Sequence, residues 1–178
     1  THFVTGLQSQ PWYEAADFEH ARILLEEYES IKQEADDLLF KHKRAAESAE
    51  GNTEAEDGFR AYASPTLLSG QWRDVTLMLN GRAQPASVNC PRTMAALKRI
   101  GENATSMVMG SAYLSFMAPG SHLREHCGPS NCRLRTHLGL NLEAGKSRMR
   151  VWKETRHWAA GEVLVFDDSF THEVWNDS

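Results

Sequence analysis

The chain has 178 residues, of which 41% are hydrophobic and 24% charged, as expected of a globular protein with one buried core. The net charge of −5 offers no basic surface, so we expect no nucleic-acid partner. No apolar run approaches the roughly 20 residues that span a bilayer, and no signal peptide is visible, so we expect a soluble stretch without a membrane segment.

The N-terminal part of the chain indicates an arm followed by a helix. Residues 1–16 predict an irregular arm anchored by Pro11-Trp12-Tyr13. A long amphipathic helix is expected over 16–43 because apolar side chains recur there at helical spacing. The residues of this stripe are Ile23, Tyr28, Ile31, Ala35 and Leu38.

A polar loop, a strand and a short helix are expected next. Residues near 45–60 are rich in Ala, Glu, Gly and Asn, a composition typical of a solvated loop. Residues 71–80 predict a strand that ends at the turn signal Asn80-Gly81. Pro91 suits the first position of a helix that carries Met94, Leu97 and Ile100 on one side.

Short strands with turn residues between them dominate the remainder of the chain. The expected strands cover 108–116, 133–142, 148–153, 162–166 and 170–175. Because the helices are confined to the first half, this order favours a β-sandwich or barrel with helices on one side.

One of these strands alternates in an unusual way. From Arg133 to Leu140, two arginines and His137 occupy one face, while leucines and a threonine occupy the other. Guanidinium groups grip carboxylates and phosphates at two points, so this face resembles the wall of an anion pocket.

Two histidines are the best candidates for metal ligands. His126 precedes a Gly-Pro turn and His172 lies in the last expected strand, so two strands of a folded sheet can bring them together. His122 is the rival to His126, because a His-x-x-x-His pair on a helix binds zinc. Turn residues on both sides of the pair leave little room for that helix.

The three cysteines, Cys90, Cys127 and Cys132, lack the Cys-x-x-Cys spacing of a zinc site. A disulfide between Cys127 and Cys132 stays open at this stage, and with it the redox compartment.

Two long motifs resemble a known family. They are His126-Cys-Gly-Pro-Ser-Asn-Cys-Arg-Leu-Arg-Thr-His-Leu-Gly-Leu140 and Phe166-Asp-Asp-Ser-Phe-Thr-His-Glu-Val-Trp-Asn176, preceded by Tyr113-Leu-Ser-Phe-Met-Ala-Pro-Gly-Ser121. In order and spacing these motifs resemble the aspartyl/asparaginyl β-hydroxylases, which are iron(II)- and 2-oxoglutarate-dependent dioxygenases. The resemblance is strongest over 111–178 and absent in the loop near 45–60.

The resemblance implies one dioxygenase domain over 1–178. Residues 1–105 would give helical support, and 106–178 the core of a double-stranded β-helix, a jelly-roll or cupin-like barrel that carries the metal. The family's last strand brings an arginine to the distal carboxylate of 2-oxoglutarate, and this chain stops at Ser178, before that strand.

For the metal, the resemblance implies His126 and His172 as ligands. Other oxygenases place a carboxylate two residues after the first histidine, where this chain has Gly128, as the β-hydroxylases do. Asp168 would then hydrogen-bond a metal-bound water, and its direct ligation stays open.

For the cosubstrate, the resemblance implies contacts from two sets of residues. Arg135 and His137 would meet a carboxylate, and Arg135 alternatively that of the substrate. Ser115 would donate to the distal carboxylate, and Met117 and Trp72 would line the pocket.

The implied activity is hydroxylation of the β-carbon of Asp or Asn in a protein or peptide, such as an epidermal-growth-factor-like module, with Fe(II), 2-oxoglutarate and O₂. The alternatives are a hydroxylase of lipid acyl chains or free amino acids, a catalytically silent ligand-binding barrel and, least favoured, a zinc hydrolase. The first residue is Thr1, so we expect an excised domain. The resemblance allows the endoplasmic-reticulum lumen if a membrane anchor was removed, and the sequence predicts no oligomeric state.

Overall fold

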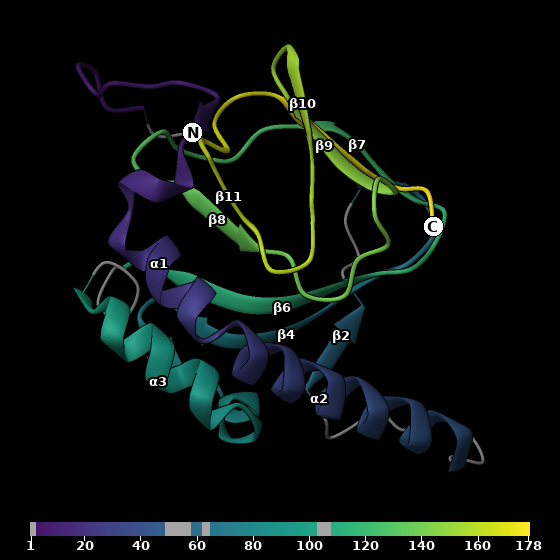
Figure 1. Cartoon of the computed structure of the whole chain (residues 1–178). Coiled ribbons are helices and arrows are strands. Elements are labelled where there is room, and N and C mark those ends of the chain that lie inside the picture. The colour runs from purple at the N-terminus through teal and green to yellow at the C-terminus, as the bar shows by residue number, and fades with distance from the viewer. Residues whose placement is uncertain (1–2, 49–57, 62–64, 103–107) are drawn as a thin grey trace. The chain divides into compact units, whose positions relative to one another are not determined.

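A computed structural model describes residues 3–48, 58–61, 65–102 and 108–178. Figure 1 labels the helices and strands of the chain. The chain divides into two compact units, each assembled from separate segments. Unit 1 contains Thr1–Leu25, Ala63–Trp72 and Met117–Ser178, and unit 2 contains Glu26–Tyr62 and Arg73–Phe116. The expected single domain with a boundary near residue 105 stays a prediction.

The described helices are those of the N-terminal half, as expected. The α-helices are α1 (Glu19–Glu26), α2 (Tyr28–Ser48) and α3 (Pro91–Ile100), with 3₁₀ turns η1 (Ala15–Asp17) and η2 (Pro85–Asn89). The single helix expected over 16–43 is therefore wrong in detail, because it breaks at Glu27 and runs on to Ser48. No helix in the described ranges combines the length and apolar character needed to cross a membrane.

The strands in the described ranges form three sheets. One has the order β1-β11-β8 and a second β10-β9-β12-β7-β3, while in the third β4 pairs with β2, β5 and β6. Their bounds are β1 (Trp12–Tyr13), β2 (Phe59–Ala61), β3 (Leu67–Ser69), β4 (Trp72–Leu79), β5 (Arg82–Ala83), β6 (Ser111–Met117), β7 (Ser121–His126), β8 (Arg135–Leu138), β9 (Ser147–Val151), β10 (Glu154–His157), β11 (Val163–Phe166) and β12 (His172–Asn176). The described strands close no barrel, so the double-stranded β-helix stays a prediction.

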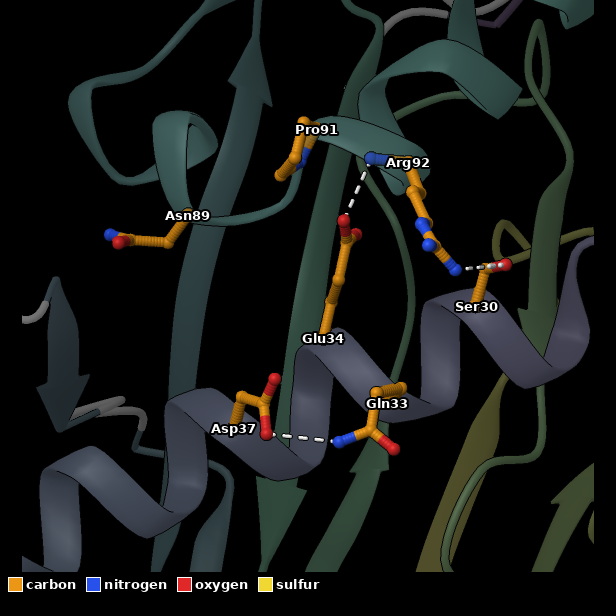
Figure 2. Close-up of a pocket in the computed structure, with 7 residues that line it drawn as sticks. All are labelled: Ser30, Gln33, Glu34, Asp37, Asn89, Pro91 and Arg92. Atoms are coloured by element: carbon orange, nitrogen blue, oxygen red, sulfur yellow. Dashed lines mark hydrogen bonds between the residues drawn. The ribbon is translucent and has the colours of Figure 1, made fainter.

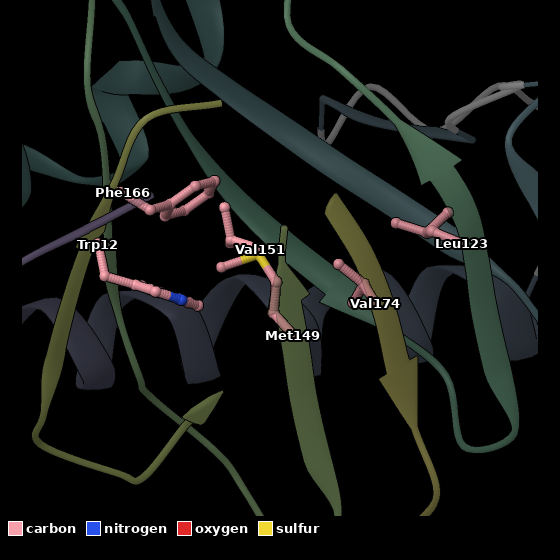
Figure 3. Close-up of a cluster of buried hydrophobic side chains, with 6 residues drawn as sticks. All are labelled: Trp12, Leu123, Met149, Val151, Phe166 and Val174. Atoms are coloured by element: carbon pink, nitrogen blue, oxygen red, sulfur yellow. The ribbon is translucent and has the colours of Figure 1, made fainter. Parts of the chain in front are cut away.

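The core of unit 1 lies between its two sheets. Trp12 and Phe166 come from the three-stranded sheet, and their rings are 5.7 Å apart. The five-stranded sheet supplies the opposing side chains (Figure 3). These are Leu123 of β7, Met149 and Val151 of β9, and Val174 of β12. Met149 and Val151 at alternate positions of β9, together with Val174 of β12, thus turn one face of that sheet toward the other sheet.

The outer face of the three-stranded sheet is covered by helix α1. Ala21 of this helix packs with Val163 and Val165 of β11, joined by the partly buried Leu134 and Leu138. The hydrogen bond between His20 Nε2 and Thr136 Oγ1, 2.8 Å long, fastens the helix to β8. Since the apolar side of β8 faces the helix, its Arg135 and His137 face the core between the sheets.

Unit 2 joins its helices through a buried carboxylate, that of Glu34. Its oxygens accept hydrogen bonds from the backbone N–H groups of Arg92 and Thr93 and from the Thr93 hydroxyl, at 2.7 to 2.9 Å. Glu34 of α2 therefore caps the first turn of α3, which has no side-chain cap of its own. A pocket of about 320 Å³ surrounds this cap (Figure 2). The polar group at the centre of this pocket, the Glu34 carboxylate, is already used to cap α3.

The strand predictions differ from the structure at strand ends and in the strands that they omit. The strand expected over 71–80 is β4, and its turn holds Asn80 and Gly81 at φ 52° and 71°, as a tight hairpin requires. The strand expected over 133–142 is shorter, because β8 covers only Arg135–Leu138. Strands β1, β2, β3, β5, β7 and β10 were not predicted. Of the loop expected near 45–60, residues 49–57 lie outside the described ranges.

Candidate metal and anion site

His126 and His172 lie opposite each other on neighbouring strands. His126 ends β7 and His172 begins β12, and the two are direct partners in the antiparallel register. Their ring centroids are 4.1 Å apart. The expectation that strand pairing brings these two histidines together is met by this geometry, while their role as metal ligands stays a prediction.

A register shift in β7 decides which histidine joins the pair. His172 pairs with His126, but Val174, two residues on, pairs with Leu123, three residues back. The extra residue reverses the alternation, so His126 points to the same face as the core residue Leu123. His122 lies on the other face, where its Nε2 is 2.8 Å from Glu173 Oε1 and its ring stacks on Trp175. His122 is therefore not placed with the pair.

Backbone carbonyls set the tautomer of both histidines. His126 Nδ1 lies 2.8 Å from the Arg124 carbonyl oxygen, and His172 Nδ1 lies 2.9 Å from that of Phe170. A carbonyl oxygen only accepts, so each Nδ1 carries the proton and donates it. In the neutral ring the lone pair is then on Nε2, which is the arrangement of a metal-binding imidazole whose other nitrogen is held by the protein.

His172 is buried, with 7% of its surface exposed. Burial lowers its pKa, and the positive charge of Arg135 acts in the same direction, although the Phe170 carbonyl and the negative charge of Asp168 oppose them. The ring is thus neutral at physiological pH. A metal ion requires the neutral imidazole, so the environment of His172 favours ligation.

Asp168 lies in the turn between β11 and β12 and is almost fully buried. Its Oδ2 accepts hydrogen bonds from Arg133 Nη2 at 2.8 Å and from Arg135 Nε at 3.0 Å. Burial by itself raises the pKa of Asp168, but the hydrogen bond from Arg133 and the charge of Arg135 outweigh it and hold this pKa below its usual value. The carboxylate is therefore ionised, and the three side chains together carry one positive charge.

The face of β8 that carries Arg135 was expected to bind an anion. In this structure the anion is the carboxylate of Asp168 from the same chain. Sequence analysis assigned Arg135 to a cosubstrate or substrate carboxylate and did not consider Asp168 as its partner. It also gave Arg133 no role of its own, although Arg133 makes the shorter contact. The spacing of two residues between Arg133 and Arg135 could have indicated a shared partner, because it places both side chains on one side of the strand.

His137 forms the wall next to this charged group. Its ring stands edge-on to Phe166 at 4.9 Å and stacks against Trp158 at 5.8 Å between centroids. Burial, together with the charge of Arg135, lowers the pKa of His137 to about 3. His137 is therefore a neutral hydrogen-bonding group beside cationic arginines.

The remaining predicted residues lie in different places. Trp72 and Met117 are partly buried and pack against the apolar core of unit 1. Ser115 is an exposed residue of β6 and belongs to unit 2. Contacts of these three residues with a cosubstrate stay predictions. Cys127 and Cys132, for which a disulfide was open, are free thiols.

The N-terminal arm also contacts the segment that carries Asp168. Ser9 Oγ donates to Asp167 Oδ2 at 2.6 Å, and the Asp167 N–H donates to the Pro11 carbonyl. Asp167 Oδ1 accepts from the Ser169 N–H at 2.9 Å. The turn between β11 and β12 is therefore fixed on both sides of Asp168, and sequence analysis had no basis for this contact.

The donor set fits one metal ion held by two imidazoles. No group of three or more His, Cys, Asp or Glu side chains suited to a metal occurs in the described part of the chain, so Asp168 does not complete a triad. The two Nε2 atoms are the available ligands, and a pair of this kind leaves several coordination positions for other molecules.

Fold and site together define a mainly β protein with a two-histidine candidate metal site next to paired arginines. A sequence profile of the aspartyl/asparaginyl β-hydroxylase family matches residues 25–178. The chain belongs to this family.

Three relatives illustrate the range of the family. The chain is 35% identical over 176 residues to the mouse protein named aspartyl/asparaginyl β-hydroxylase, and 34% identical over 179 residues to the human protein of that name. Each alignment covers 98% of this chain and 22% of the relative. The chain is 30% identical over 175 residues to the ornithine lipid ester-linked acyl 2-hydroxylase of Rhizobium tropici, covering 96% of this chain and 57% of that relative.

Proposed function

We propose that this chain is an iron(II)- and 2-oxoglutarate-dependent hydroxylase that adds a hydroxyl group to the β-carbon of Asp or Asn in a protein or peptide. One observation carries the proposal. The Nδ1 atoms of His126 and His172 are both engaged by backbone carbonyls, so both Nε2 atoms are available to one ion. Family membership supports hydroxylation as the reaction.

In this proposal His126 and His172 hold Fe(II). When bound, iron with 2-oxoglutarate and O₂ would supply the oxidation that converts a C–H bond to C–OH, with release of succinate and CO₂. The protein's own part is to bind, orient and exclude water. Phe166 and the core behind it close the inner side of the histidine pair.

Arg135 and His137 would provide the polar wall for a carboxylate. The two arginines and the carboxylate of Asp168 together have a net charge of one positive unit. This net positive charge would favour binding of a further anion. His137 is neutral and donates or accepts without adding to that charge. Asp168, held by two guanidinium groups, would hydrogen-bond a metal-bound water. Ser115, Met117 and Trp72 are the further cosubstrate contacts that the proposal includes.

The experiment is hydroxylation of Asp- and Asn-containing peptides with Fe(II), 2-oxoglutarate and O₂. We expect a mass gain of one oxygen and an equal amount of succinate, both absent when 2-oxoglutarate is omitted. The exposed His157 of β10 offers a control, because His157→Ala should retain what His172→Ala loses. Metal uptake without oxidation of either a peptide or an acyl chain would instead indicate a silent binding domain.

A second candidate substrate is a lipid acyl chain, favoured by the name of the Rhizobium relative. The same assay with an acylated amino acid in place of the peptide separates the two. Mass gain in the acyl chain but in no peptide would replace the peptide proposal.

A further inference from the structure

Arg150 lies on the outer face of the five-stranded sheet, opposite the face of the histidine pair. Its neighbours in β9, Met149 and Val151, point to the core, so alternation along the strand turns Arg150 the other way (Figure 3). The antiparallel register places Arg150 directly opposite Glu173, the residue that follows His172 in β12. Arg150 is therefore the cross-strand neighbour of a residue adjacent to a proposed metal ligand.

The guanidinium group of Arg150 bridges two carboxylates from different strands. Its Nη2 donates to Glu173 Oε2 of β12 and to Glu125 Oε1 of β7, both at 2.5 Å. Glu125 directly precedes His126 in the chain. The other terminal nitrogen, Nη1, donates to the Trp152 carbonyl at 3.2 Å. One cation thus connects residues adjacent to both histidines.

Glu125 belongs to the register shift in β7, where Arg124 and Glu125 together stand opposite Glu173 alone. Such a bulge interrupts the ladder of backbone hydrogen bonds, so backbone pairing holds it less firmly than a regular strand. The same shift brings the two histidines to one face of the sheet. By contacting carboxylates on both sides of the bulge, Arg150 supplies a connection that the ladder lacks there.

His122 orients the central carboxylate of this network, that of Glu173. His122 Nε2 lies 2.8 Å from Glu173 Oε1, and a carboxylate only accepts, so this nitrogen carries the proton. The side chain of Glu173 is 15% exposed, and both of its oxygens have a partner. Without Arg150 this enclosed carboxylate would lack its cation, whereas Glu125, 56% exposed, could be solvated. Arg150 is therefore the member on which the network depends most.

We propose that Arg150 is a positioning residue for the histidine pair. By holding Glu125 and Glu173 together it fixes the bulge of β7 against β12, and so keeps the two imidazoles at a separation that suits one metal ion. Because Arg150 lies on the opposite face of the sheet, it acts through the backbone of the two strands and not as a ligand. This inference rests on the proposed function, since it takes the histidine pair to be the metal site.

The test is an anaerobic titration with Co(II), followed by visible absorption, which requires no turnover. Arg150→Gln removes the cation and the bridge. Its Kd for Co(II) should rise about tenfold, the lower end of the range typical of residues that support metal ligands. The absorption spectrum of the bound Co(II) should also change, because it depends on how the two imidazoles are placed around the ion.

Arg148→Gln is the matched control. Arg148 lies on the same face of β9, where it pairs with Asp177 and lies 4.7 Å over the ring of Trp175. The control removes the same type of side chain from the same surface, but no contact at the bulge. It should leave the Kd and the spectrum of Co(II) unchanged, even where urea unfolding shows that it costs as much stability as Arg150→Gln.

Glu125→Ala keeps the test decisive if Arg150→Gln does not fold. The side chain of Glu125 is the exposed end of the network, so its removal should leave the fold intact. The Kd for Co(II) should rise about two- to fivefold, as expected for loss of an exposed ion pair. The double variant should bind Co(II) no more weakly than Arg150→Gln alone, because both changes remove one shared contact.

Four results would overturn the inference. They are a wild type that binds no Co(II), wild-type affinity in Arg150→Gln or Glu125→Ala, an equal loss of affinity in Arg148→Gln, and losses that add in the double variant. Turnover with Fe(II) and 2-oxoglutarate separates this inference from the proposed function. Co(II) affinity that depends on Arg150, without oxidation of a peptide or an acyl chain, rejects the function alone. Oxidation by the wild type, with unchanged Co(II) affinity in Arg150→Gln, rejects the role of Arg150 alone.

Discussion

Gly128 and Asp168 are in direct contact. The Gly128 N–H donates to the Asp168 carbonyl at 2.5 Å, and a Cβ added to Gly128 would lie 2.4 Å from the carboxyl carbon of Asp168. Gly128 is two residues after His126, a position that holds a carboxylate in the usual iron site of two histidines and one carboxylate. In this chain the carboxylate of Asp168 fills the neighbouring space instead, so the glycine is required by packing.

We therefore predict that Gly128→Ala destabilises the protein. The new methyl group must displace a buried carboxylate held by two arginines, which costs about 1–3 kcal/mol in the free energy of unfolding. Urea unfolding measures this cost. Gly145→Ala is the control for an alanine that meets no neighbour, because no atom lies within 4 Å of its Cβ, and its φ of 73° adds a backbone strain that Gly128 does not have. A loss no larger than that of the control would contradict the packing argument.

Asp168→Ala should reduce kcat/KM less than removal of either histidine. It leaves Arg133 and Arg135 without their shared carboxylate and removes the acceptor proposed for a metal-bound water. Changes next to a metal site typically cost about 10–100-fold. Steady-state kinetics and the metal content of the purified variant check this prediction. Loss of all bound metal would make Asp168 a ligand.

His126→Ala and His172→Ala should each abolish Fe(II) binding and turnover. Each removes one of the two Nε2 ligands in the proposed site, and no third ligand in the described residues compensates. His172 is the more buried of the two, so His172→Ala should also lower the free energy of unfolding more. Anaerobic Fe(II) titration and urea unfolding measure both effects. Near-normal iron binding in either variant would reject the metal assignment.

The mainly β character with helices before the strands, and the meeting of His126 with His172, were predictable because they depend on local patterns. Alternation along β8 places Arg135 and His137 on the face toward the core between the sheets. The antiparallel register agrees, because it pairs Arg135 with the core residue Phe166 of β11. Family motifs then named His126 and His172. These conclusions need only residue spacing and the identity of short motifs.

The register shift in β7 was not predictable from spacing. In a regular strand an even separation places His122 and His126 on one face, and only the pairing with β12 reverses this. The ion pair of Asp168 with Arg133 was missed for a related reason, since its partners come from distant segments. Pairing between distant segments determines both the register shift and this ion pair, and such pairing cannot be recognised from the sequence of either segment alone.

The three cysteines should differ in reactivity toward iodoacetamide. Burial raises the pKa of Cys90 to about 11, and the neighbouring charge of Glu34 adds to this effect. At pH 8 its thiol is therefore protonated as well as inaccessible, whereas Cys127 and Cys132 are exposed. Mass spectrometry of the native protein should find label on these two first. Early labelling of Cys90 would contradict the buried core of unit 2, and urea-unfolded protein provides the fully labelled control.

Arg135→Lys tests whether the strand of Arg135 faces a ligand carboxylate. Lysine replaces a planar guanidinium by a point charge, at a cost of about 1–3 kcal/mol for a two-point contact. If Arg135 meets the cosubstrate, the KM for 2-oxoglutarate should rise about 5- to 150-fold while that for the peptide stays constant. If it meets the acidic side chain of the substrate, the peptide KM should rise instead. Arg148→Lys, on the opposite face of the five-stranded sheet from the core residue Met149, is the control. An Arg135→Lys variant with both KM values unchanged would show that Arg135 serves Asp168 alone, and the carboxylate-binding wall proposed for this strand would be wrong.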